Sequence, residues 1–244
     1  MKQFAVIGLT VLLSACGGGG DSASSPTPAP APTATAEGFW EGPASTGVSV
    51  ALAVLETGET WGVYTSSGAV VGALYGTTTS SGTTLSGSGK DFNIPSRSVG
   101  SGTYSGTFAA KSIINVATST GSTFSGAYKT AYDQPASLAA LAGTFSGVGV
   151  SGTSPVQTVS VTISPSGSIT VPSSLGCSAA GTSTPRPSGK SIFDLTMTFT
   201  GSNCALGNGA ATTGIAYYDA ITRRVTVMAM NATKSDGFIY VGQK

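Results

Sequence analysis

The sequence contains no histidine. This absence excludes serine–histidine–aspartate and cysteine–histidine catalysis, because both use an imidazole as the general base. It also excludes zinc sites with histidine ligands and a switch based on histidine protonation near neutral pH. The chemistry open to the chain is therefore narrow, and we predict no catalytic residue, no metal site and no cofactor.

Charged residues are also scarce. They make up only 9% of the chain, and the formal net charge is +1. No basic face is present, so we expect no nucleic-acid partner. Paired carboxylates would be the remaining catalytic group, but Glu56 and Glu59 flank a turn, Asp219 lies in a second turn, and Asp194 lies on a strand. Because nothing brings two of these together as a glycosidase requires, we predict that the protein is not an enzyme.

The first sixteen residues have the pattern of an export signal. Lys2 supplies a positive charge, residues 4–13 are mostly apolar, and small residues follow. The apolar run is too short to span a bilayer. Leu-Ser-Ala-Cys at residues 13–16 resembles the bacterial lipobox, which implies cleavage before Cys16 and a lipid on its thiol. Gly17 replaces the aspartate typical of inner-membrane lipoproteins, so the resemblance implies the outer membrane as the location and a membrane partner through the lipid. The alternative is an ordinary signal peptide.

Two further cysteines, Cys177 and Cys204, remain. An even pair in an oxidising compartment predicts a disulfide. A two-cysteine metal site is the alternative, but it would need ligands that histidine cannot supply here.

Beyond the signal, the composition changes twice. Residues 16–36 contain four consecutive glycines and alternating prolines, which predict a disordered tether after the lipidated cysteine. From residue 37 onward, apolar residues alternate at period two, as in residues 48–54, 159–163 and 193–199, and turn residues recur between these runs. The pattern predicts an all-β fold with two consecutive small antiparallel β-barrel or sandwich lobes. A transmembrane barrel is the alternative, but a lipobox and the lack of aromatic girdles argue against it.

The two lobes read as copies of one unit, residues 37–134 and 135–244. Gly38-Phe39-Trp40 opens the first and Gly143-Thr144-Phe145 opens the second, and a glycine turn follows in each half, at residues 58 and 167. Between them, residues 135–143 predict a short helical turn with a serine cap at Ser137. The opening resembles the Gly-x-Trp start of lipocalin-like barrels, with phenylalanine in place of tryptophan in the second lobe. This resemblance implies that Trp40 and Phe145 pack at barrel ends.

The layout of lipidated cysteine, tether and two β lobes also resembles transferrin-binding and factor-H-binding surface lipoproteins. The resemblance implies a non-catalytic binding or adhesion role with a protein partner that the residues do not identify. A structural envelope lipoprotein is the alternative hypothesis. We expect recognition to lie in two polar loops, residues 77–89 and 181–189, with a positive tip at Arg186 and Lys190. A last set of aromatic residues is expected to pack in the core rather than line a pocket: Trp40, Trp61, Tyr217 and Tyr218.

Overall fold

The computed structural model describes residues 35–151 and 154–244. The predicted signal segment, the predicted lipid site at Cys16 and the tether up to residue 34 lie outside the described residues. Within the described part, no helix is long and apolar enough to cross a membrane. Both lobes belong to one compact unit.

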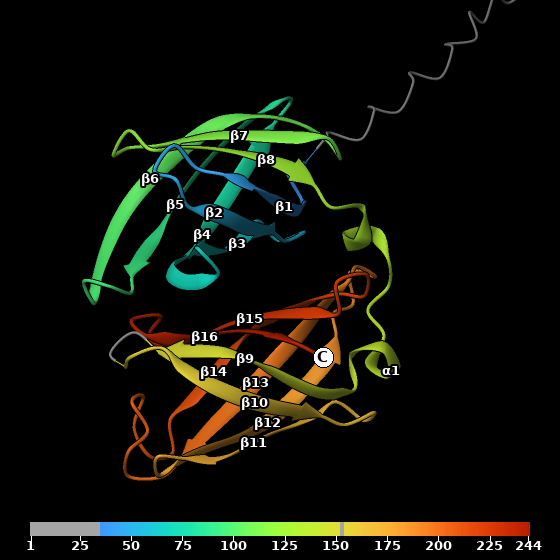
Figure 1. The fold of residues 1–244 in the computed structure, drawn as a ribbon. Helices are drawn as coiled ribbons and strands as arrows, with labels where there is room; N and C mark the ends of the chain where they lie inside the picture. Colours follow the sequence, from blue (N-terminus) through green and yellow to red (C-terminus); the bar gives the residue numbers. More distant parts are fainter. Residues whose placement is uncertain (1–34, 152–153) are drawn as a thin grey trace, which may run out of the picture. The chain divides into compact units, whose positions relative to one another are not determined.

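The first lobe is a closed antiparallel barrel of eight strands (Figure 1). Each strand pairs with the next one along the chain, and β8 pairs with β1 to close the ring, which is an up-and-down arrangement. The strands are β1 (Gly38–Pro43), β2 (Ser49–Val54), β3 (Glu59–Ser66), β4 (Ala69–Ser81), β5 (Thr84–Asn93), β6 (Ser98–Ala109), β7 (Ile113–Thr118) and β8 (Thr123–Tyr128).

The second lobe repeats this topology, with β16 pairing back onto β9. Its strands are β9 (Gly143–Ser151), β10 (Gln157–Ile163), β11 (Ser168–Ser174), β12 (Cys177–Pro185), β13 (Ile192–Thr200), β14 (Ala211–Asp219), β15 (Arg224–Asn231) and β16 (Gly237–Gln243). The predicted fold of two consecutive antiparallel β lobes is confirmed, and both lobes are barrels.

Two short helices connect the barrels: η1 (Thr130–Asp133) and α1 (Leu138–Leu141). The helical turn expected within residues 135–143 is α1. The Ser137 hydroxyl accepts a hydrogen bond from the Ala140 backbone N–H at 3.3 Å, as a serine N-cap does. The chain thus enters the second barrel through a capped turn.

The two barrels share one turn in detail. Gly58 between β2 and β3, and Gly167 between β10 and β11, both have positive φ, of 81° and 86°. Each glycine carbonyl accepts a hydrogen bond of 2.7 Å from the backbone N–H of a buried hydroxyl residue, Thr78 in the first barrel and Ser183 in the second. A Cβ at either glycine would lie 2.4 Å or less from that residue's carbonyl oxygen. Glycine is required at both turns for the same steric reason.

Neighbouring apolar residues are buried on opposite sides of a strand. Trp40 points into the first barrel, while Phe39 packs outside it in the seam between the barrels, and both are almost fully buried. Tyr218 and Tyr217 divide in the same way in β14. The described residues therefore form three apolar cores, which are the two barrel interiors and the seam.

The expectation that residues 77–89 and 181–189 are polar loops is wrong for most of both segments, although residues 186–189 do lie between strands. Residues 77–89 form the end of β4 and the first part of β5, and residues 181–189 begin as the second half of β12. Gly82 lies in the turn between these strands with a φ of 59°, whereas Gly87 serves strand packing. A Cβ at Gly87 would lie 2.3 Å from the Tyr104 ring and 2.5 Å from the Thr77 carbonyl oxygen. The segment has the glycine-rich composition of a loop because close strand packing also requires small residues.

Candidate functional site

The opening aromatic residues occupy the same place in both barrels. Trp40 and Phe145 are each the third residue of their barrel's first strand, and neither is exposed. The indole Nε1 of Trp40 donates a hydrogen bond to the carbonyl oxygen of Ala36 at 3.1 Å. Ala36 is itself buried, so the last residue assigned to the tether packs against the first barrel.

One end of the second barrel is closed. Helix α1 precedes β9, and its buried Leu141 packs with Phe145 in the barrel core. The side-chain ammonium of Lys244 donates a hydrogen bond to the Ala140 carbonyl oxygen at 2.6 Å. The same ammonium lies 5.1 Å from the ring centroid of Phe145 and 5.0 Å from that of Tyr218. The helix and the lysine together cover this end.

The opposite end of the second barrel holds a cavity of about 160 Å³. Inward-facing side chains from five strands supply its apolar wall: Val159, Val161, Val171, Ala179, Met197, Phe199, Phe238 and Tyr240. The rings of Phe199 and Phe238 meet edge to face at a centroid distance of 5.4 Å. This is the kind of concave apolar site that holds small ligands.

Small inward residues create this space. Gly149 and Ala179 face the cavity, whereas Phe145 and Ile163 fill the barrel toward its closed end. The phenol of Tyr240 is held within the wall, because it donates a hydrogen bond to the Phe145 carbonyl oxygen at 3.0 Å. Burial raises the pKa of Tyr240 to about 12, so this phenol stays neutral at physiological pH. The cavity thus has an uncharged wall.

The rim of the cavity is polar and uncharged. Backbone and hydroxyl groups of Ser151 and Ser174 and the half-buried Gln157 side chain lie among its lining residues. No aspartate, glutamate, lysine or arginine is among the described residues that line the cavity. The rim can therefore donate and accept hydrogen bonds but cannot neutralise an ion.

The predicted Cys177–Cys204 disulfide is confirmed, and it lies beside the cavity. It connects the start of β12 to the segment between β13 and β14, which also places Leu206 on the cavity wall. The Asn203 side chain donates a hydrogen bond to the Leu175 carbonyl oxygen at 2.9 Å. Leu175 has a φ of 52° and is 76% exposed. The Asn203 amide thus binds the backbone of a residue whose apolar side chain is exposed.

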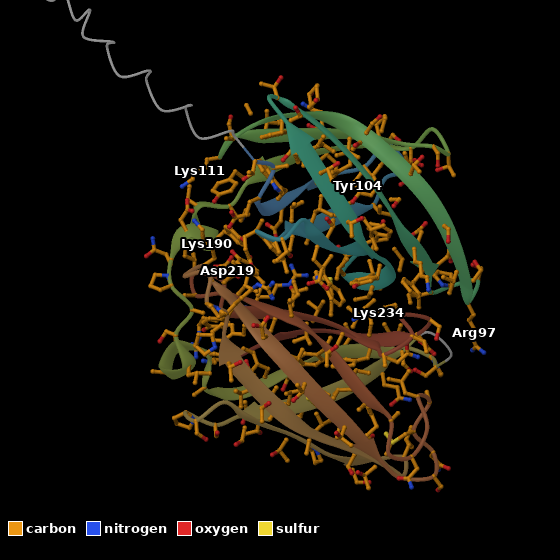
Figure 2. The ribbon with its side chains drawn as sticks, turned by 180° about the vertical axis from the view of Figure 1, so that it is seen from behind. Arg97, Tyr104, Lys111, Lys190, Asp219 and Lys234 are labelled. Carbon is orange, nitrogen blue, oxygen red and sulfur yellow. A yellow bond between two sulfur atoms is a disulfide. The ribbon has the colours of Figure 1, made fainter. Side chains whose placement is uncertain are left out.

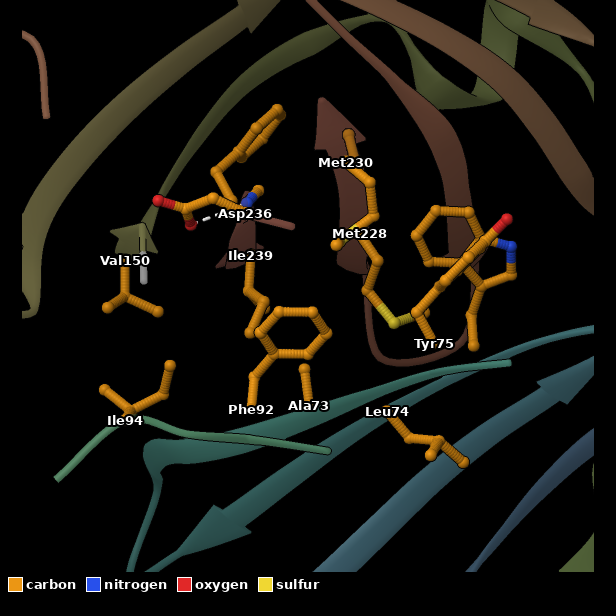
Figure 3. Close-up of a pocket in the computed structure, with 14 residues that line it drawn as sticks. Ala73, Leu74, Tyr75, Phe92, Ile94, Val150, Met228, Met230, Asp236 and Ile239 are labelled. Carbon is orange, nitrogen blue, oxygen red and sulfur yellow. Dashed lines mark hydrogen bonds between the residues drawn. The ribbon is translucent and has the colours of Figure 1, made fainter. Parts of the chain in front are cut away.

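The seam between the barrels is apolar and closely packed. The rings of Phe39 and Tyr217 stack with their centroids 3.8 Å apart. Figure 3 shows Met228 and Ile239 of the second barrel above Ala73 and other residues of the first. The space left between these side chains is only about 30 Å³, which is about the volume of one water molecule. This void is too small to hold a ligand.

Ion pairs border the seam. The Arg186 guanidinium donates to the Glu56 carboxylate at 2.9 Å and to the Asp194 carboxylate at 2.5 Å, and its side chain is 14% exposed. Burial would lower the pKa of Arg186, but the hydrogen bonds and charges of both acids raise it overall. Lys190 binds Asp133 at 2.7 Å near the junction between the barrels (Figure 2). The expected positive loop tip is therefore wrong, because both cations are paired: Arg186 with one carboxylate of each barrel, and Lys190 with Asp133 of the connecting helix η1.

A polar hollow of about 310 Å³ lies beside these pairs, lined by Glu59, Trp61 and Lys234 among others. The Lys234 ammonium lies 5.8 Å from the Trp61 ring centroid. The indole Nε1 of Trp61 is buried and has no hydrogen-bond partner among the described residues. Arg186, which also lines the hollow, already binds two carboxylates. We regard the hollow as the weaker candidate site, since its principal hydrogen-bond donor is occupied.

The carboxylates are placed as structural groups. Glu56 and Asp194 meet at Arg186, and Asp219 accepts hydrogen bonds from the backbone N–H groups of Ile221 and Thr222. Among the described residues, no three histidine, cysteine, aspartate or glutamate side chains form a group that could hold a metal ion. The open end of the second barrel is thus the main candidate site.

Comparison with known protein families, with curated proteins and with solved structures found no match for this chain. The candidate site therefore rests on its own geometry. The alternating pattern alone did not indicate this cavity, although its strands carry small inward residues, Gly149 and Ala179, among bulky ones.

Proposed function

We propose that this chain is a lipid-anchored protein of the bacterial cell envelope that binds a small apolar ligand without transforming it. The observation that carries the binding role is the apolar cavity at the open end of the second barrel. An engineered protein cavity of about 150 Å³ stays dry and holds one benzene molecule, so this cavity has the capacity for a group of that size.

The anchor is proposed from the N-terminal sequence. The lipobox-like residues 13–16 place a lipid on Cys16, and Gly17 favours the outer membrane. We expect Cys16→Ser to leave the membrane fraction and to stop partitioning into detergent, because two or more acyl chains are needed for stable anchoring. A variant that remains in the membrane like the parent protein would contradict the anchor. Protease treatment of intact cells then distinguishes a surface location from a periplasmic one.

The binding role can be tested with benzene as the probe. Met197 lines the cavity, whereas Met228 and Met230 lie in the seam. Methyl-labelled methionine therefore supplies one reporter and two internal controls in the same NMR spectrum. We expect benzene to shift the Met197 signal in a saturable way and to leave the other two unchanged.

Two matched variants control this experiment. Ala179→Leu places a larger side chain in the cavity and is expected to abolish the shift, whereas Ala180→Leu adds the same side chain on the exposed face of β12. A Met197 signal that does not respond to benzene in the parent protein would rule out the site.

A structural envelope role is the second candidate. The apolar seam favours it, because the stacked Phe39 and Tyr217 rings tie the two barrels into one compact unit. This role predicts that loss of the protein weakens the envelope even when the cavity is filled by Ala179→Leu. The binding role predicts that filling the cavity reproduces the effect of losing the protein.

A further inference from the structure

We infer that the ligand of the second barrel is an uncharged amphiphile. Its apolar part, about the size of one six-membered ring, would fill the cavity, and a neutral polar head would stay at the rim. This inference rests on the proposed binding function and specifies the class of ligand that the same site accepts.

The wall and the rim select against ions. None of the described residues that line the cavity carries a charge, and the sulfurs of Cys177 and Cys204 are joined in a disulfide. A carboxylate or an ammonium group that entered would lose its water without gaining a counter-ion, which is strongly unfavourable. Free fatty acids and amines are therefore poor ligands for this site.

The rim does offer neutral hydrogen-bonding groups. The Gln157 amide supplies two donors and an acceptor, and the exposed Ser174 supplies a hydroxyl. A hydroxyl or amide head group could replace its water contacts with these side chains at little cost. The rim therefore fits an alcohol or an amide better than a bare hydrocarbon.

The outer edge of the rim is apolar at two points. Leu175 adjoins Ser174 and is 76% exposed, and Val156 adjoins Gln157 and is 41% exposed. The backbone at Leu175 is held in a left-handed conformation that leucine rarely adopts, with its carbonyl bound by Asn203. Neither side chain lines the cavity itself, so both add exposed apolar surface next to rim residues in the chain.

The experiment compares three probes that share one ring: benzyl alcohol, benzoate and benzylamine. At pH 7 the first is neutral, the second is an anion and the third is a cation. We expect benzyl alcohol to shift the Met197 methyl signal with an affinity at least about tenfold higher than that of either ion. Benzoate binding as tightly as benzyl alcohol would overturn the inference.

A pair of rim variants tests where the head group lies. Gln157→Lys is expected to improve benzoate binding and Gln157→Glu to improve benzylamine binding, each about tenfold, because each supplies the missing counter-ion. Opposite changes in the two variants support a head group at the rim, and unchanged affinities in both would contradict it. The Met228 and Met230 signals report whether each variant remains folded.

The outcomes separate the two proposals. If benzene and benzyl alcohol both fail to shift Met197, the binding site itself is wrong. If benzene binds but the three probes bind equally, only the inference about charge is wrong.

Discussion

At the scale of single residues, the disulfide has the clearest role. Cys177 and Cys204 are 27 residues apart in sequence, and their bond ties the β13–β14 connection to the strand that borders the cavity. A cross-link of this separation restricts the unfolded chain, which is the usual source of disulfide stabilisation.

We predict that replacing both cysteines, as Cys177→Ser with Cys204→Ser, lowers the free energy of unfolding by about 3–4 kcal/mol on the chain-entropy estimate. Denaturant unfolding followed by the methyl signal of Met197, which lies in the same barrel as the disulfide, measures this change. Reduction of the parent protein should reproduce the loss. A change below about 1 kcal/mol would show that the disulfide does not restrict the unfolded chain enough to stabilise the fold.

The same variant should also lose benzene binding. Leu206 reaches the cavity from the segment that the disulfide holds, so its release removes part of the wall. The Met197 methyl signal measures the loss. Unchanged benzene affinity in the folded variant would mean that the segment keeps its position without the bond.

At the scale of secondary-structure elements, the connecting helix η1 is held in place by ion pairs of one carboxylate. Asp133 at its end accepts hydrogen bonds from Lys190 at 2.7 Å and from Lys111 at 3.0 Å. Burial would raise the pKa of Asp133, but the hydrogen bonds from Lys190, Lys111 and Tyr128 lower it below its usual value. The element is therefore held electrostatically on both sides.

We predict a pH-dependent effect of Asp133→Asn. Because the pKa of Asp133 is lower in the folded state, the carboxylate stabilises the fold above the unfolded-state pKa of about 4 and loses this effect as the pH falls. The variant should therefore be less stable by about 1 kcal/mol at pH 7, and the difference should shrink below pH 4 or so. Thermal unfolding across the pH range measures both.

Asp219→Asn is the matched control for this experiment. Asparagine keeps the side-chain oxygen that accepts from the backbone N–H groups of Ile221 and Thr222, so we expect little change at any pH. If Asp133→Asn behaves like this control, the ion pairs at η1 contribute nothing measurable.

At the scale of the whole molecule, the seam is the apolar interface that each barrel would expose to water if it stood alone. Each barrel closes through its own strand pairs, yet each also has an outer apolar face that the other covers. Phe39 and Trp61 on the first barrel and Tyr217 and Met228 on the second are buried there. Separated barrels would expose these side chains to water.

We predict that two fragments, residues 35–134 and 135–244, fold separately and bind each other when mixed. The burial of both apolar faces drives the association, and analytical ultracentrifugation should detect a one-to-one complex. Tyr217→Ala in the second fragment should weaken binding because it removes the ring stacked on Phe39. Ile221→Ala, at a residue 87% exposed, should not. Fragments that stay apart would show that the seam contributes little to stability.

The sequence by itself determined the local features. Period-two alternation predicted the strands, Ser137 predicted the cap of α1, and the glycines at residues 58 and 167 marked equivalent turns. The cysteine count, once Cys16 was assigned to the lipid, predicted the disulfide. These features depend on neighbours in the chain or on simple counting, so the order of residues is enough to specify them.

Only the tertiary structure decided the rest. The alternation of apolar residues does not show which side of a strand faces the barrel interior and which faces the other barrel. The different roles of the adjacent residues Phe39 and Trp40, in the seam and in the barrel interior, therefore follow only from the folded structure. Arg186 and Glu56 are 130 residues apart, and composition placed the arginine on an exposed tip. The cavity depends on the same closure, because the space beside Ala179 exists only where six strands converge and no large side chain fills it.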